Sequence, residues 1–263
     1  MKVLYLLISI VFLFSLDSML AQEMELVKFD DGTEIEVQVI NTTPDDVRKL
    51  SLYLGLFGPD GTNIQGVSYY LPRKALFDIK WGYGFIEDLV SFNASTTIIL
   101  KSIQKERDMK VSLKTDNYVN STVNYVTKIP SNRQTSFGLR LGAGKVTYFD
   151  GLRRNHISFG GSMLRTKHLS LYVPSRKNKP LELSSIGALH FESVFYSKPI
   201  NFGFDGVDHV DKTDIGIRLY YEKGVSFWGG SGRFGFRYMI GAVASRHIVF
   251  DLTGGFGISY MLL

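Results

Sequence analysis

The sequence predicts an all-β protein in which a small β-rich region precedes a C-terminal antiparallel transmembrane β-barrel. Apolar and polar residues alternate with period two over several long segments of the second half. These segments run for about nine to fifteen residues, whereas soluble strands average about five or six and membrane-spanning strands need about nine to eleven. The composition, with 26 Gly and 13% aromatic residues, is typical of sandwiches and barrels.

Residues 1–21 have the three parts of a secretory signal peptide. Lys2 supplies the positive start, Val3 to Leu16 is an uncharged and mostly apolar run, and Asp17 to Ala21 leads from a polar to a small residue, so we expect cleavage before Gln22. An uncleaved anchor is the alternative, although the apolar run is short for a membrane span. The chain contains no Cys, which excludes a lipoprotein anchor, disulfides and thiolate metal sites.

The mature chain is predicted to divide into three parts. Residues 22–88 form a small periplasmic β region, 89–108 a linker, and 109–263 the outer-membrane barrel. At the start, Glu25 to Phe29 and Thr33 to Ile40 flank Asp30-Asp31-Gly32, a turn sequence that predicts a β-hairpin. Val67 to Leu71 and Phe77 to Trp81 read as further strands of this region.

The N-terminal motif resembles the periplasmic β segment of many Bacteroidetes-type outer-membrane barrel proteins. In that pattern, a Lys-centred strand and an Asp-Gly turn precede a Glu-Ile strand, and a Pro-Lys pair precedes an alternating strand. The matching residues are Val27, Lys28, Phe29, Asp31, Gly32, Glu34, Ile35, Val39, Pro72, Lys74, Phe77, Ile79 and Trp81. This chain departs from the pattern where Arg73 separates Pro72 from Lys74. The resemblance implies an outer-membrane location and no particular activity.

The barrel is predicted to have about eight strands, an even number that leaves both ends in the periplasm. The segments are 109–115, 118–127, 135–149, 156–168, 183–197, 213–224, 232–245 and 248–262. Thr96 to Ile103 would make a ninth strand and is assigned to the N-terminal region or linker. The alternative is a barrel of ten or twelve strands that recruits the N-terminal hairpins. Lys198 to Thr213 is the longest outward loop, and it contains His209 and three Asp.

If the apolar faces meet lipid, the opposite faces fill the barrel interior. This predicts an internal charge network of Arg140, Arg218, Arg237, Glu192, Glu222 and Asp251, beside His190 and Tyr220. A narrow barrel is filled by its side chains, and buried charges there need partners. We therefore interpret these residues as an ion-paired plug that replaces a hydrophobic core, rather than as a proton or ion path.

His156 and Ser158 form the one constellation that suggests catalysis. They lie two residues apart on one face of a strand, an arrangement that resembles the His-x-Ser of outer-membrane lipid A 3-O-deacylases. The resemblance implies that Ser158 would be the nucleophile and His156 the base. The family pattern continues with Asn and a later Glu, whereas this chain has Phe159 and no Glu before Glu182. The preferred interpretation is that both residues line the loop or lumen.

We therefore expect a non-enzymatic outer-membrane barrel with a structural or binding role. Its partners would be outer-membrane lipids and envelope proteins met through the N-terminal region or the outward loops. The rivals are a lipid A deacylase-like hydrolase and a soluble periplasmic β-sandwich or ligand-binding barrel. The five His show no metal spacing, no cofactor is expected, and the +5 net charge lacks a dense basic run, which excludes nucleic acid as a partner.

Overall fold

The computed structural model describes residues 24–262 except 48, 58–61, 84–89, 120, 148–152, 175–179, 198–199, 203–208, 212–214, 227–233 and 246–250. The described chain is almost entirely β-structure, with a single short 3-10 helix at Pro44–Asp46. No helix in these described ranges is long and apolar enough to cross a membrane.

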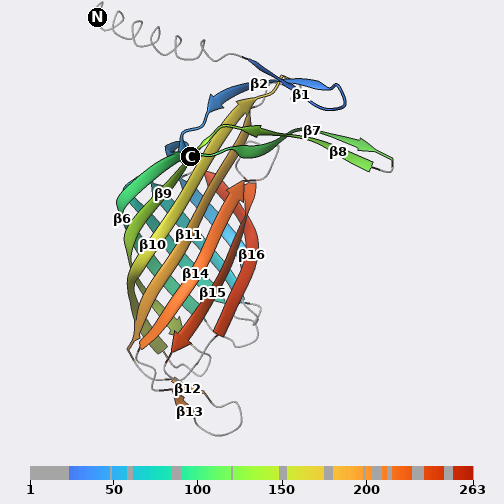
Figure 1. Ribbon diagram of the computed structural model, residues 1–263. Coiled ribbons are helices and arrows are strands. Elements are labelled where there is room, and N and C mark those ends of the chain that lie inside the picture. Colours follow the sequence, from blue (N-terminus) through green and yellow to red (C-terminus); the bar gives the residue numbers. More distant parts are fainter. Residues whose placement is uncertain are drawn as a thin grey trace, which may run out of the picture.

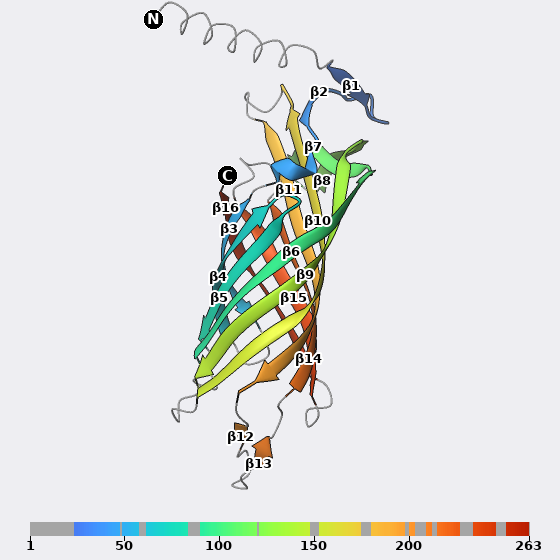
Figure 2. The same cartoon turned by 90° about the vertical axis from the view of Figure 1, so that its left-hand side faces the viewer.

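Ten antiparallel strands close into a barrel, which is seen from two sides in Figures 1 and 2. In barrel order these strands are β3 (Leu50–Phe57), β4 (Thr62–Leu71), β5 (Ala75–Tyr83), β6 (Val90–Glu106), β9 (Asn132–Thr147), β10 (Arg153–Tyr172), β11 (Leu181–Tyr196), β14 (Ile215–Ser226), β15 (Phe234–Ser245) and β16 (Asp251–Leu262). The last strand closes on the first, with Leu262 opposite Leu50.

The predicted number of eight strands was wrong, and the ten-strand alternative is confirmed. Residues 50–106, assigned to the periplasmic region and linker, supply four barrel strands, and Thr96 to Ile103 lies within β6. Conversely, 109–115 and 118–127 belong to β7 (Met109–Tyr118) and β8 (Ser121–Ile129), which pair only with each other. The sequence pattern could not distinguish the two kinds of strand. A hairpin that packs one face on a core and a strand of a barrel wall both alternate with period two.

The N-terminal hairpin is confirmed as β1 (Glu25–Lys28) and β2 (Glu34–Asn41). Gly32 adopts a φ of 80° in its turn, a conformation in which a side chain is strained. The later part of the N-terminal motif lies in the barrel wall, since Pro72 to Lys74 form the turn between β4 and β5. Arg73, the residue that departs from the pattern, has a φ of 59° there and pairs with Asp45 at 2.8 Å.

Two hairpins extend beyond the barrel at the end where β3 begins and β16 ends. The β6–β9 pair continues through Arg107 and Ser131 into β7 and β8, and β10 and β11 run on to Tyr172 and Leu181. The protruding end of β10 pairs with β2. We refer to β1, β2, β7, β8 and the ends of β10 and β11 as the cap.

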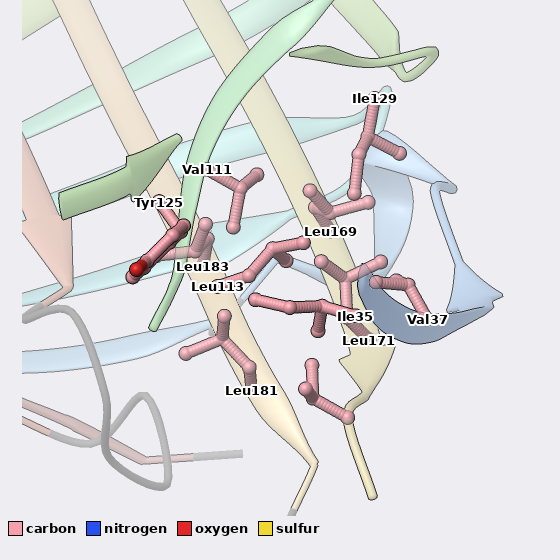
Figure 3. Close-up of a cluster of buried hydrophobic side chains, with 11 residues drawn as sticks. Ile35, Val37, Val111, Leu113, Tyr125, Ile129, Leu169, Leu171, Leu181 and Leu183 are labelled. Atoms are coloured by element: carbon pink, nitrogen blue, oxygen red, sulfur yellow. The ribbon is translucent and has the colours of Figure 1, made fainter. Parts of the chain in front are cut away.

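The cap has its own hydrophobic core, drawn in Figure 3. Its buried side chains are Ile35, Val37, Val111, Leu113, Tyr125, Ile129, Leu169, Leu171, Val173, Leu181 and Leu183. Val27 of β1 packs against them. Tyr125 also donates a hydrogen bond to Asp31 at 2.9 Å, which ties the β1–β2 turn to β8. The cap is therefore a small packed unit continuous with the barrel wall.

At the opposite end of the barrel, the chain between β11 and β14 carries a short hairpin. It consists of β12 (Ile200–Phe202) and β13 (His209–Asp211), within the predicted long loop Lys198 to Thr213. Figure 1 shows this hairpin at the far end from the cap. The packed cap thus lies at one end of the barrel and the short β12–β13 hairpin at the other.

Candidate functional site

The barrel interior holds the largest cluster of charged side chains in the described chain. Arg140 is 1% exposed, Glu192 and Asp78 are 0% and 1% exposed, and Glu222 and Arg237 are also buried. They come from five different strands, namely β5, β9, β11, β14 and β15. Successive side chains of a strand point to opposite faces, and each of these five lies on the face of its strand that points into the barrel.

Arg140 joins two carboxylates at one side of the cluster. Its Nε donates to Glu192 Oε1 at 2.6 Å, and its Nη1 donates to Asp78 Oδ2 at 3.0 Å. Further hydrogen bonds reach the hydroxyls of Thr97 and Ser95. Glu192 is itself shared, because Arg218 donates to its other oxygen. The guanidinium therefore satisfies its donors in a water-poor environment.

Glu222 is the second centre. It accepts hydrogen bonds from Arg237 at 2.8 Å and from Lys80 at 2.9 Å, and its Oε1 lies 3.3 Å from His190 Nε2. Arg237 also donates to Ser68, whose hydroxyl donates to Asp78. Asp78 thus links the Glu222 and Arg140 centres into one network.

The network contains four cations and three carboxylates. The cations are Lys80, Arg140, Arg218 and Arg237, and the carboxylates are Asp78, Glu192 and Glu222. Tyr220 lies among them, with the Lys80 ammonium 5.3 Å, the Arg218 guanidinium 5.5 Å and the Arg140 guanidinium 5.9 Å from its ring centre. Cations over an aromatic face are attracted by the ring quadrupole. Burying an ion costs several kcal/mol unless partners replace its water, and here each ion has them.

The structure brings together five of the six residues predicted for the internal network. Arg140, Arg218, Arg237, Glu192 and Glu222 are all ion-paired, and the side chain of Asp251 lies outside the described residues. Sequence reasoning missed Asp78 and Lys80. Both lie on the same face of β5, in the segment that the sequence analysis assigned to the periplasmic region. Had this segment been predicted as a barrel strand, its alternation would have placed both residues in the interior.

His156 and Ser158 are both buried on the inner face of β10, at 8% and 4% exposure. No hydrogen bond joins them, because Ser158 Oγ has no partner among the described residues. His156 Nε2 lies 3.4 Å from Asn93 instead. Glycines on β9 make room for them: a Cβ on Gly142 would come within 2.5 Å of Ser158 Oγ, and one on Gly144 within 2.4 Å of the His156 ring. Both side chains are packed against the wall.

A different serine and histidine do make contact in the interior. Ser162 Oγ lies 2.6 Å from His190 Nδ1, and the other ring nitrogen faces Glu222, so the order is that of a Ser-His-Glu triad. All three are buried, with His190 at 0% exposure. A nucleophile needs a space beside it for the reacting carbon. Ser162 is instead 3.3 Å from Thr97 Oγ1, which places it inside the hydrogen-bonded filling of the barrel.

A small cavity lies within the interior network. A cavity of about 30 Å³ lies between Ser68, Asp78, Glu222 and Arg237, which is room for one or two waters. Towards the cap, Val47, Tyr70, Leu76, Leu164 and Ala188 pack into an apolar layer. The described residues contain no group of His, Asp and Glu that could hold a metal ion.

Comparison with known proteins found no family model that matches the chain and no curated protein that matches it. The fold is a ten-stranded antiparallel barrel.

Proposed function

We propose that this chain is an exported outer-membrane β-barrel with a plugged interior and a structural or binding role exercised through its cap and loops. The observation that carries the proposal is an inverted distribution of side chains. Soluble proteins bury apolar side chains and expose charged ones, whereas this barrel buries Arg140, Glu192 and Glu222 and exposes its apolar residues.

Every barrel strand contributes to the apolar outer wall. One residue from each strand, in barrel order, is Leu54, Tyr69, Ile79, Phe92, Leu141, Ile157, Phe191, Ile217, Phe236 and Ile258, and all are 38% to 62% exposed. Soluble monomers rarely expose a contiguous apolar patch beyond a few hundred Å². A wall that is apolar around its full circumference is suited to lipid acyl chains.

The height of this wall also fits a bilayer. On β10, the outward residues between Asn155 and Arg165 are Ile157, Phe159, Gly161 and Met163. At about 3.3 Å per residue and a tilt of about 40°, this ten-residue step covers about 25 Å along the barrel axis. The apolar bands of outer-membrane barrels are about 25 Å tall.

The cap is the part best suited to meet other envelope components. In this proposal both it and the ends of the barrel chain face the periplasm, because ten is an even number of strands. The cap buries its own core and has edges on β1, β7 and β8 that pair with no further strand of the described chain. Buried ion pairs occupy the interior of the barrel instead. We assign no catalysis to the protein.

Membrane fractionation of cells that express the full chain tests the proposal. The protein should be found in the outer membrane, resist extraction by high salt and alkaline carbonate, and need detergent for solubility. In a denaturing gel the unheated barrel should migrate differently from the heated one. A soluble, monomeric protein in detergent-free periplasmic extract would contradict the proposal and favour a soluble barrel.

The hydrolase alternative is tested separately. Lipid A from cells with and without the protein, and with S158A or S162A, should give the same acyl pattern by mass spectrometry. A loss of one acyl chain that depends on either hydroxyl would show that the barrel is an enzyme.

A further inference from the structure

Six basic side chains lie on the outer wall of the barrel, on the cap side of the apolar band. They are Lys101, Lys105, Arg133, Arg165, Lys167 and Lys223, and we refer to them as the basic belt. They occupy the same alternate positions as the exposed Phe137 on β9, Phe159 on β10 and Leu219 on β14. They therefore face away from the interior network.

The basic belt is continuous across neighbouring strands. Lys105 on β6 is opposite Arg133 on β9, and Arg133 is opposite Lys167 on β10. Within the described chain, the positive charges of Arg107 and Arg165 act on Arg133. Lys167 is likewise repelled by the charges of Arg133, Lys223, Arg107 and Arg165. Like charges repel, so this grouping costs free energy unless an anion is present.

Carboxylates are missing from this part of the wall. The sequences of β9 and β10 contain no Asp or Glu, and in β6 the one acidic residue is Glu106 at the end of the strand. Arg133 Nε is moreover inaccessible to water and has no hydrogen-bond partner among the described residues. The interior cations Arg140, Arg218 and Arg237 are paired with carboxylates, whereas the Nε of Arg133 is not.

The belt lies where phospholipid headgroups would be. Arg165 is the first charged outward residue of β10 after the band that begins beyond Asn155. Lys223 is opposite Tyr238, and the rings of Tyr221 and Tyr238 are 6.0 Å apart between the belt and the apolar wall. Tyrosine at the border of an apolar band marks the membrane interface.

We infer that the basic belt binds the phosphate groups of anionic phospholipids in the leaflet that faces the cap. This inference rests on the proposed membrane location and adds a lipid class and a side of the membrane to it. Arg165, Lys167 and Arg133 lie on adjacent strands and can surround one headgroup, with Lys223 and Lys101 at its edges. A phosphate would supply the negative charge that this wall lacks.

The test uses the refolded mature chain in lipid nanodiscs that contain phosphatidylcholine with or without phosphatidylglycerol. Native mass spectrometry after release from the nanodisc measures which lipid stays bound. The wild type should retain phosphatidylglycerol, and R133Q/R165Q/K167Q should lose this preference by about fivefold for each cation removed. The control K28Q/K110Q/K128Q removes the same charge from the cap and should keep the preference.

The outcomes separate this inference from the proposed function. Insertion of the wild type without preference for phosphatidylglycerol, or an equal loss in the control variant, would overturn the belt alone. Failure of the chain to enter nanodiscs at all would overturn the membrane location and the belt with it. Displacement of the lipid by inorganic phosphate would overturn the assignment to a headgroup, whereas persistence of the lipid in excess phosphate supports it.

Discussion

At the scale of single residues, the interior depends on charges that cannot be removed one at a time. Glu192 accepts hydrogen bonds from Arg140, Arg218 and the Tyr220 hydroxyl. Removing one member of a buried ion pair leaves the other as an uncompensated charge, which costs more than the pair itself contributes. The network therefore links strands that are not neighbours in the wall, since Asp78, Arg140 and Glu192 lie on β5, β9 and β11.

The substitution E192Q tests this dependence. It keeps the shape of the side chain and removes its charge, so the free energy of unfolding should fall by about 3–5 kcal/mol. Urea unfolding in lipid vesicles, followed by tryptophan fluorescence, measures the change. The control E34Q removes a carboxylate that is 45% exposed and pairs with Lys28, and should change stability by less than about 1 kcal/mol. Equal effects would contradict a specific role of the network.

A second prediction at this scale concerns Asp31. The backbone hydrogen bond from Thr33 and then the hydrogen bond from Tyr125 hold the pKa of Asp31 below its ordinary value. The stabilisation is thus present above the pKa of the unfolded chain and is lost as the pH falls through the lower folded value. Y125F should raise the pKa of Asp31 towards its ordinary value. A carboxyl-carbon NMR titration measures this, and an unchanged pKa would show that the hydroxyl is not involved.

At the scale of elements, the same alternating pattern serves two environments. The strands β7 and β8 place Val111, Leu113 and Tyr125 in the cap core, whereas β9 places Leu139 and Leu141 on the outer wall. Barrel closure uses no hydrogen bond from β7 or β8. The cap hairpin should accordingly unfold independently of the barrel.

The substitution L113A tests this independence. Leu113 is fully buried, and removal of its side chain should destabilise the cap by about 2–5 kcal/mol. Limited proteolysis should then cut within residues 109–129, while the heat-dependent gel shift of the barrel stays unchanged. The control V119A alters a fully exposed residue and should leave the proteolysis rate as it is. Loss of the gel shift in L113A would show that cap and barrel fold together.

The C-terminal strands could be predicted from the sequence because their alternation is long and regular. The strand number could not, because local patterns do not say which segments pair. Gly66, Pro72 and Gly82 bound the short strands that the sequence predicted at Val67 to Leu71 and Phe77 to Trp81. In the structure these segments belong to the longer strands β4 and β5 of the wall. The pairing of β16 with β3 joins residues some two hundred positions apart, a contact that no short-range pattern records.

Part of the charged interior could also be predicted from the regular alternation of the C-terminal strands. Arg140, Glu192 and Glu222 alternate with apolar residues on strands that were correctly placed, so their shared face followed from the pattern. Asp78 and Lys80 could be placed inside only after β5 was known to be a barrel strand. The Ser162–His190 contact depends on the register of β10 against β11, which sets Ser162 opposite His190.

At the scale of the whole molecule, the barrel is a closed wall around a filled interior. Because barrel diameter grows with strand number, ten strands enclose about half as much area again as eight. Charged and aromatic side chains occupy that interior here. Ion pairs and the apolar layer of Tyr70, Leu76 and Leu164 occupy the described interior, and the cavity beside Asp78 and Glu222 measures about 30 Å³.

The closed interior predicts that the protein does not conduct ions. In planar bilayers, the refolded chain should insert without stable single-channel conductance, while a sixteen-stranded porin in the same bilayers should give open channels. Steady conductance from the purified chain would show that the network opens in lipid. That outcome would favour a channel over a structural or binding role.

The contact between β3 and β16 has a consequence for biogenesis. Because the first and the last wall strands pair with each other, the barrel cannot close until residues 251–262 are in place. For the export that we propose, closure therefore has to wait until these residues have crossed the inner membrane. Until then, two unpaired borders are accessible to other chains, and an escort that shields them would be needed during transit. A chain cut short before residue 251 should accumulate as periplasmic aggregate or be degraded, even though nine of its ten wall segments are intact.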